Sequence, residues 1–277
     1  MSTSRHTITL WQDAQIRSLE MEILDEEPLA IRVQGQPYAV VMRTPGEELA
    51  HAAGFCFTEG IVDRPEDIEI VDQPEEIRQL AACDTEDTNV VTVTLTPERR
   101  AAIGGHLARR GFISQTGCGL CGKTVIEEVV QQLPPVAGDV VIPLAEAEKC
   151  LRQMDRLQPM RQSSAASHAA AIFDADLNPL AVMEDVGRHN ALDKAIGRLF
   201  LDRRLHLAKV LMLSSRISYE LVQKAARARI PIILALSRPT RLALDLADRL
   251  GISLAGAAKP AGLYLYCHPR RFVESRR

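Results

Sequence analysis

Two cysteines, Cys118 and Cys121, stand two residues apart in a run rich in glycine, Thr116-Gly117-Cys118-Gly119-Leu120-Cys121-Gly122. Glycine reaches positive φ values without a steric penalty, so the run predicts a mobile loop that can present a sulfur. A helix is expected directly after the loop. Its N-terminal amides, together with Lys123, would favour the thiolate form that acts as the nucleophile. The pattern therefore indicates reactive sulfur rather than packing.

Three kinds of chemistry fit such a pair: half of a zinc site, a dithiol redox pair, or a sulfur carrier in which one cysteine bears a persulfide. A closed zinc site needs four ligands. The chain has no second C-x-x-C, and Cys267-His268 has no spacing that would complete the site. A redox pair usually follows an apolar strand, whereas a polar stretch precedes this one. We favour a sulfur carrier without zinc, with Cys118 and Cys121 as the catalytic residues, and leave the other two chemistries open.

Hydroxyl and cationic side chains follow three successive apolar segments that are expected to be strands. They are Ser214-Ser215-Arg216, Ser237-Arg238 and Ala258-Lys259-Pro260. In open α/β sheets, ligands bind at the carboxyl ends of strands, where the next helix directs its amides toward them. Serine also serves as an ordinary helix cap, so each turn alone has a second interpretation. Together the three turns predict a phosphate or nucleotide ligand.

A fourth polar cluster, Glu184 to Lys194, surrounds an expected helix start. Within it Arg188 and His189 could bind an anion, or the cluster could be a capped, solvated helix with internal ion pairs. Further upstream, His168-Ala169-Ala170 invites comparison with the H-x-E element of zinc deaminases. The carboxylate of that element is missing and the C-x-x-C precedes the histidine, so hydrolytic deamination is disfavoured.

Composition sets the broad class. The chain has 277 residues, 46% of them hydrophobic, which is enough for one large or two modest domains. It has no apolar stretch long enough to span a bilayer and no secretory signal, so we expect a soluble, cytoplasmic protein with no membrane partner. Residues 1–96 hold 6 basic and 19 acidic side chains, whereas residues 97–277 hold 27 and 17. The second part favours anions, but without a run of like charges nucleic acid is not expected as a partner.

The first part, residues 1–133, is expected to be a small α+β domain that ends in the loop 111–123 and a following helix. Segments 29–33 and 38–42 flank a glycine turn and predict a hairpin. Thr44, Pro45 and Glu47 read as N-cap, first helical position and capping-box partner of a helix. Residues 89–95 predict a strand, and residues 97–110 an arginine-rich helix.

The second part, residues 134–277, follows Pro134-Pro135, which would end the preceding helix. Its pattern alternates between helices and short apolar strands, and this order predicts a three-layer α/β/α domain. Helices are expected at 144–157, 190–201, 217–229 and 240–250. Strands are expected at 168–173, 179–184, 209–213, 231–236, 252–257 and 263–267.

Several motifs in order resemble the FdhD family of formate dehydrogenase accessory sulfurtransferases. The resemblance covers essentially the whole chain, from Glu26 to Pro269. Besides the cysteine run, it is carried by Ser167-His168-Ala169-Ala170-Ala171, Glu184-Asp185-Val186-Gly187-Arg188-His189, Ala191-Leu192-Asp193-Lys194, Ser214-Ser215-Arg216, Tyr219-Glu220-Leu221-Val222-Gln223-Lys224 and Lys259-Pro260.

The resemblance implies a homodimeric protein that takes sulfur from a cysteine desulfurase to the molybdenum or tungsten bis-guanine-dinucleotide cofactor of formate dehydrogenase. The resemblance also implies that a GDP-like nucleotide can substitute for that cofactor. It further implies that the second domain is similar to the cytidine deaminase fold without its zinc. The persulfide position matches Cys118, and the cofactor-binding stretch matches Ala257, Ala258, Lys259, Pro260, Ala261 and Gly262. Ala261 and Gly262 stand where the family can have a glycine-arginine pair. A rival hypothesis is a non-catalytic chaperone of a guanine-nucleotide cofactor with a minor metal-binding cysteine pair.

Overall fold

The computed structural model describes residues 2–69, 89–109 and 133–274. The cysteine loop, Cys83, Lys123 and residues 124–132, where a helix is expected, lie outside these residues. The roles of Cys118 and Cys121 therefore stay predictions.

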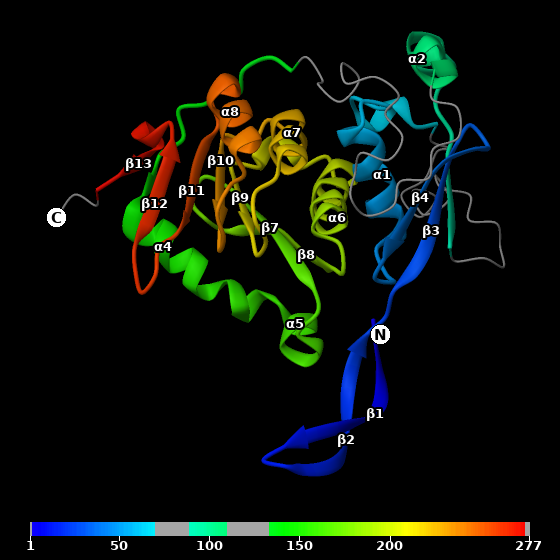
Figure 1. Ribbon diagram of the computed structural model, residues 1–277. Helices are drawn as coiled ribbons and strands as arrows, with labels where there is room; N and C mark the ends of the chain where they lie inside the picture. Colours follow the sequence, from blue (N-terminus) through cyan, green and yellow to red (C-terminus); the bar gives the residue numbers. More distant parts are fainter. Residues whose placement is uncertain (1, 70–88, 110–132, 275–277) are drawn as a thin grey trace.

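The first part of the chain contains a three-stranded sheet covered on one face by a helix (Figure 1). β3 (Glu27–Val33) pairs antiparallel with β4 (Gln36–Arg43) and parallel with β5 (Val90–Val93). Alternate side chains of β3 are buried against α1 (Glu48–Thr58), as the period of two requires. α2 (Pro97–Arg109) follows β5. The predicted hairpin, the strand near 89–95 and the arginine-rich helix are confirmed.

The predicted start of the first helix is wrong. α1 begins at Glu48, and its N-cap is Glu47 in a left-handed conformation with φ of 64°. Thr44 is buried instead, where its N–H donates to Asp185 Oδ2 at 3.1 Å and its hydroxyl accepts from Val186 N at 3.0 Å. The partners that hold Thr44 lie about 140 residues further along the chain, and local capping rules do not include them.

The second part is built on a six-stranded sheet with the order β12-β11-β10-β9-β7-β8. Three of its strands, β9, β10 and β11, are parallel, and the others pair antiparallel. The strands span β7 His168–Phe173, β8 Pro179–Asp185, β9 Val210–Leu213, β10 Ile232–Ala235, β11 Ser253–Ala257 and β12 Leu263–Cys267. Each predicted strand is confirmed to within one or two residues.

Helices cover both faces of this sheet. On one face lie α6 (Arg188–Leu201), α7 (Tyr219–Arg227) and α8 (Arg241–Leu250) (Figure 1). On the other face, α4 (Leu144–Gln153) and the short pair β6 (Ile142–Pro143) and β13 (Phe272–Val273) bury a second apolar cluster. The mixed α/β class and the layered order follow the prediction. The likeness to a cytidine deaminase and the boundary at residue 134 stay predictions.

The two parts share one apolar cluster, which joins α1 to α6. The two helices approach closely because glycine faces glycine. A Cβ on Gly54 would lie 1.9 Å from the carbonyl oxygen of Asp193, and one on Gly197 would lie 1.7 Å from that of Ala50. No side chain fits at either position, so the backbones themselves pack together and set how the first part sits on the second.

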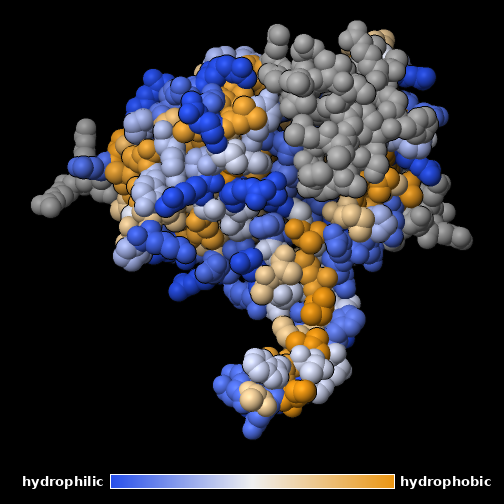
Figure 2. Space-filling model, viewed as in Figure 1, coloured by the Kyte–Doolittle hydropathy of each residue, from blue (hydrophilic) through white to orange (hydrophobic). Residues whose placement is uncertain are grey.

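A long hairpin, β1 (Thr3–Gln12) and β2 (Gln15–Leu24), projects from the body and was not predicted (Figure 1). At its tip, Trp11 and Ile16 are 71% and 75% exposed. Figure 2 shows hydrophobic surface along this projecting arm. Short α5 (Pro159–Ser164) contacts β2. Within the described parts of the chain, no helix has the length and hydrophobicity needed to cross a bilayer.

Candidate functional site

The strand ends that were predicted to bind a ligand meet at one edge of the six-stranded sheet. Because β9, β10 and β11 are parallel, their carboxyl ends lie side by side. β7 runs the other way and β8 reverses again, so the start of β7 and the end of β8 reach the same edge, where His168 pairs with Asp185. This edge carries His168, Arg188, His189, Ser214, Ser215, Arg216, Ser237 and the stretch Ala257–Gly262. The structure thus brings together every predicted site residue that it describes.

In the turn that follows β9, the hydroxyls of Ser214 and Ser215 form hydrogen bonds with the backbone. Ser214 Oγ accepts the N–H of Ala169 at 2.8 Å, which ties the end of β9 to the start of β7. The Ser215 hydroxyl is buried and donates to the carbonyl of Arg216 at 2.9 Å. Arg216 itself is exposed. In this turn the hydroxyls position the cation that a ligand would meet.

The stretch 257–262 closes the turn between β11 and β12 at the other end of the edge. Ala258 N–H donates to the Gly262 carbonyl at 2.9 Å, and Gly262 N–H donates to Glu148 of α4 at 3.1 Å. Gly262 has a φ of 101°, a value that side chains rarely adopt, so glycine suits this turn. Lys259 is exposed at the tip.

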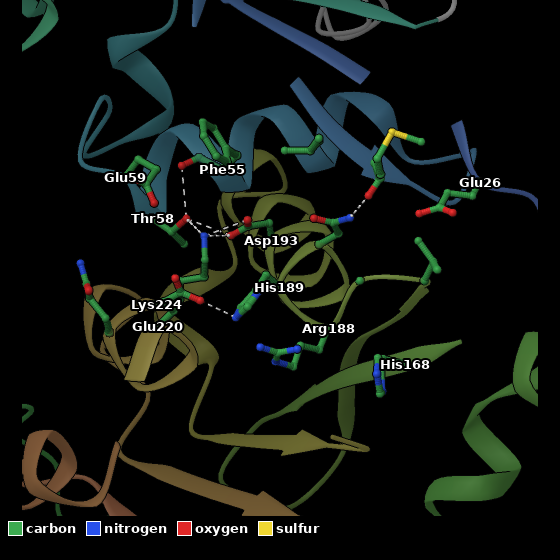
Figure 3. Close-up of a pocket in the computed structure, with 16 residues that line it drawn as sticks. Glu26, Phe55, Thr58, Glu59, His168, Arg188, His189, Asp193, Glu220 and Lys224 are labelled. Atoms are coloured by element: carbon green, nitrogen blue, oxygen red, sulfur yellow. Dashed lines mark hydrogen bonds and ion pairs between the residues drawn. The ribbon is translucent and has the colours of Figure 1, made fainter. Parts of the chain in front are cut away.

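A cavity of about 320 Å³ lies at the opposite end of the edge, between the first part of the chain and the starts of α6 and α7 (Figure 3). Its volume is at the lower end of the range for small-molecule sites. One wall comes from β4 and α1. The other comes from His168, from Val186 to Asn190, and from α7. Its lining includes Phe55, Thr58, Glu59, His168, Arg188, His189, Asp193, Glu220 and Lys224.

A buried ion pair braces the cavity. Lys224 Nζ lies 2.8 Å from both carboxylate oxygens of Asp193 and 2.8 Å from the Thr58 hydroxyl (Figure 3). Burial alone would lower the pKa of Lys224, but the Asp193 carboxylate outweighs it and the pKa is raised. Removing one partner of such a pair strands a buried charge, which typically costs about 3–5 kcal/mol. The pair therefore locks α6, α7 and α1 together.

A second pair ties α6 to the first part of the chain. Lys194 Nζ lies 2.8 Å from Asp185 Oδ2 and donates to the carbonyl of Thr44 at 2.7 Å. Sequence reasoning gave no separate role to these charges, although Asp193, Lys194 and Lys224 interrupt the apolar faces of their helices. A charged residue at a core position is the signal that could have identified them.

At the cavity's cationic wall, His189 Nε2 lies 2.7 Å from Glu220 and 3.3 Å from the Ser218 hydroxyl. Burial alone would raise the pKa of Glu220, but the hydrogen bond from His189 and the nearby cations lower it. Glu220 is thus an ionised partner that fixes the His189 ring. Neither residue of this pair was predicted to contact the other.

We predict a pH dependence of stability from His51, which is fully buried on α1. Burial and the charges of Lys194, Lys224 and Arg43 hold its pKa well below the usual 6.5. The folded protein keeps His51 neutral, whereas the unfolded chain protonates it below about pH 6.5, so acid favours unfolding. Below about pH 6.5, protonation of His51 in the unfolded chain should lower the free energy of unfolding by up to about 1.4 kcal/mol for each pH unit.

Urea unfolding of the His51→Gln variant between pH 7 and 5 measures this contribution. The variant should lose less stability on acidification than the wild type. His206, which is exposed, provides the matched control, since His206→Gln should keep the wild-type slope. Equal slopes for His51→Gln and the wild type would contradict the prediction.

Comparison with known proteins agrees with this architecture. The model of the FdhD/NarQ family matches residues 24–273. Sulfur carrier protein FdhD of Mycolicibacterium paratuberculosis is 37% identical over 97% of this chain and 98% of its own length. The protein of that name from Bordetella petrii is 37% identical over 90% of this chain and 86% of its own length. A crystal structure described as a formate dehydrogenase accessory protein of Desulfotalea psychrophila has a TM-score of 0.74 at 22% identity, covering 99% of this chain and all of its own, and shares the fold.

This chain thus combines a layered α/β sheet, a polar and cationic sheet edge and a C-x-x-C run, and it is similar to a class of proteins that are named sulfur carriers. The family model matches most of the chain, and this match identifies the family. The chain belongs to the FdhD/NarQ family, and the relatives reported above are named sulfur carrier proteins.

Proposed function

We propose that this protein is a sulfurtransferase that carries persulfide sulfur from a cysteine desulfurase to the molybdenum, or tungsten, bis-guanine-dinucleotide cofactor of formate dehydrogenase. The observation that carries the proposal is the single edge that gathers the hydroxyl and cationic turns after β8, β9, β10 and β11. A ligand with several phosphates suits such an edge.

In the first step, the Cys118 thiolate attacks the terminal sulfur of the desulfurase persulfide. A sulfur–sulfur bond forms on Cys118, the bond within the desulfurase persulfide breaks, and the desulfurase cysteine leaves as a thiolate. The thiolate is the reactive form of cysteine, and in the sequence Cys118 stands between two glycines.

In the second step, the Cys121 thiolate attacks Sγ of Cys118. A disulfide between the two cysteines forms, and the terminal sulfur leaves with its electron pair toward the bound acceptor. Cellular thiols then reduce the disulfide, which restores both cysteines. The C-x-x-C spacing supports this division of roles, with Cys118 as carrier and Cys121 as resolving residue.

The acceptor is held along the sheet edge by its phosphates. Arg216, Arg238 and Lys259 are exposed there and supply positive charge. Arg238 is held over the ring of Tyr264, at 5.4 Å from its centroid. The stretch 257–262 follows β11 and Arg188 follows β8, so the two are separated by four strand spacings. At about 4.8 Å for each spacing, this part of the edge is roughly 19 Å long. That length suits an extended dinucleotide cofactor.

Mass spectrometry tests the first step and separates it from the chaperone alternative. After incubation with a cysteine desulfurase and cysteine, the peptide that contains Cys118 should gain about 32 mass units, the mass of one sulfur. Zinc bound stoichiometrically and released only by denaturation, with no sulfur added, would favour the non-catalytic chaperone with a metal-binding cysteine pair.

The proposal includes a homodimer that works in the cytoplasm, where desulfurase thiols stay reduced. Support for a second copy comes from the projecting hairpin. One of its faces carries Ile8, Leu10, Leu19, Met21 and Ile23, and several of these are exposed. A lone two-stranded hairpin is at best marginally stable in water, so another surface should cover this face.

We predict that Leu10→Ser combined with Met21→Ser weakens the dimer at least tenfold, because both side chains would then face the partner as polar groups. Sedimentation equilibrium at micromolar concentration measures the change. Thr9→Ser, on the opposite face of the hairpin, is the control. The same dimer mass for wild type and double variant across the concentration range would contradict this prediction.

A further inference from the structure

A groove of about 530 Å³ lies where the C-terminal ends of α6 and α7 meet the end of α1. The three helices contact one another (Figure 1). The floor of the groove is apolar and buried, because the rings of Phe57 and Phe200 pack with their centroids 5.1 Å apart. Arg227 lies over the Phe57 ring, and its guanidinium donates to the carbonyls of Phe57 at 3.0 Å and Val62 at 3.1 Å. These contacts give the groove a fixed shape.

The wall of this groove is positively charged. Five arginine and lysine side chains line it against two carboxylates, which leaves three positive charges. Each of the two carboxylates already pairs with an arginine of the wall. Within residues 2–69, 89–109 and 133–274, no carboxylate pairs with Lys209 or Arg229. The groove therefore favours a negatively charged partner.

Two arginines of the wall occupy backbone positions where glycine is usual. Arg203 follows α6 with a φ of 57°, and Arg229 follows α7 with a φ of 59°. At the same place α1 and α8 have Gly60 and Gly251, with φ of 80° and 69°. Glycine adopts this left-handed conformation without the strain that a side chain brings. Strained residues cluster where the side chain has a function, and both arginines are exposed.

The helix dipole does not account for these two residues. A cation near the C-terminal end of a helix is stabilising, but it acts equally well from the last helical turn. α6 and α7 already have Arg198 and Arg227 in their last turns. The further arginines beyond the helix ends therefore point to a ligand of the groove.

The groove and the cavity lie at opposite ends of α6 and α7. Arg188 begins α6 and Glu220 lies in the first turn of α7, and both line the cavity. The groove is lined by residues at and just beyond the other ends of these helices. The 14 residues of α6, at about 1.5 Å for each residue, separate the two sites by roughly 20 Å. A protein bound at the groove thus leaves the cavity and the strand ends accessible.

We infer that this groove docks an acidic segment of the sulfur donor, the cysteine desulfurase. The inference rests on the proposed function, in which the donor must bind while the acceptor edge stays accessible. Carboxylates of the segment pair with Lys209 and Arg229. A further carboxylate replaces Glu66 at Arg203, because that pair is exposed and such pairs contribute little to stability.

The position of α2 agrees with a donor at this place. In the described part of the chain, α2 is the last element before the cysteine run. Its Arg99 pairs with Asp63, which lines the groove. The donor therefore docks beside the helix from which the chain continues toward Cys118.

Biolayer interferometry with the full-length protein and the cysteine desulfurase tests the inference. The double variant Arg203→Gly with Arg229→Gly should bind the desulfurase at least tenfold more weakly, mainly through slower association. The double variant Arg203→Lys with Arg229→Lys should keep most of the affinity, since it keeps both charges. Raising NaCl from 50 to 300 mM should weaken wild-type binding more than binding by the glycine variant.

Thermal unfolding separates docking from a structural role of the two arginines. The glycine variant should have a Tm equal to or above that of the wild type, because glycine relieves the left-handed strain. Arg249→Ala is the matched control, since Arg249 is an exposed cation in the last turn of α8 and does not line the groove. It should bind the desulfurase like the wild type.

Wild-type affinity of the glycine variant for the desulfurase, or no binding of the desulfurase by the wild-type protein, would overturn the inference. Unchanged desulfurase binding together with a weaker homodimer, or with weaker binding of formate dehydrogenase, would assign the groove to that partner and also overturn it. A lower Tm together with equal losses of affinity in the glycine and lysine variants would show that the arginines are structural.

Sulfur loading distinguishes a failure of this inference from a failure of the proposed function. Inorganic polysulfide needs no docking surface, so it should add sulfur to Cys118 equally fast in the wild type and the glycine variant. A wild-type protein that binds the desulfurase through the groove but gains no sulfur refutes the transfer mechanism alone. A glycine variant that gains sulfur from limiting desulfurase as fast as the wild type refutes the docking site alone.

Discussion

Replacing Cys118 by alanine should lower the activation of formate dehydrogenase roughly 100-fold or more, because the carrier then has no atom on which to hold the sulfur. Cells that lack the native protein and express the variant at wild-type level provide the assay. The variant should also gain no sulfur from the desulfurase. Cys121→Ala should still accept one sulfur but should transfer it slowly, since the resolving thiolate is missing.

Cys150→Ala is the matched control for Cys118→Ala. Cys150 lies on α4, is half-buried, and has its pKa raised by burial and by Glu146, so its thiol is a poor nucleophile. This control should activate formate dehydrogenase like the wild type. Full activation by Cys118→Ala would show that Cys118 is not the carrier.

Replacing Gly54 by alanine should destabilise the fold by about 3 kcal/mol or more, the upper range for overpacked cores. The new Cβ would lie 1.9 Å from the Asp193 carbonyl oxygen and 2.8 Å from Gly197 N, and both contacts are backbone atoms that no rotamer change can move. α1 and α6 must therefore separate. Since Asp193 also anchors Lys224, the cavity should be disturbed as well.

Thermal unfolding measures this effect, with an expected fall of roughly 6–12 °C in Tm. Gly104→Ala is the control: Gly104 lies in α2, and a Cβ there would meet nothing within 4 Å. Alanine is a better helix former than glycine, so this control should gain about 0.5–1 kcal/mol. Equal stability of Gly54→Ala and the wild type would show that the helices are not packed backbone to backbone.

The second part of the fold was largely predictable, because its strands are short apolar runs bounded by clear turns. β7 and β12 match the predicted ranges, and α6 begins two residues before the predicted start. The alternation of strands and helices determines which strand ends lie at the same edge of the sheet. The sequence could therefore also predict that Ser214, Ser237 and Ala257 lie along one edge.

What sequence reasoning missed depends on contacts between distant residues. Thr44 has the local signature of a cap but bonds to Asp185 and Lys194. The projecting hairpin has alternating polar and apolar residues without a glycine turn, since Asp13 and Ala14 adopt positive φ at its tip. The ion pair between Lys194 and Asp185 joins α6 to the end of β8, and such a pairing follows from the packing of the elements.

Transfer of labelled sulfur in a single turnover tests the central claim most directly. Protein whose Cys118 bears ³⁴S from a desulfurase is separated from that enzyme and mixed with the bis-guanine-dinucleotide cofactor. Mass spectrometry should then show that the Cys118 peptide loses its extra sulfur and that the cofactor gains one ³⁴S per transfer. If the label stays on Cys118, or appears on the cofactor equally well with the Cys118→Ala protein, this chain is not the carrier that delivers the sulfur.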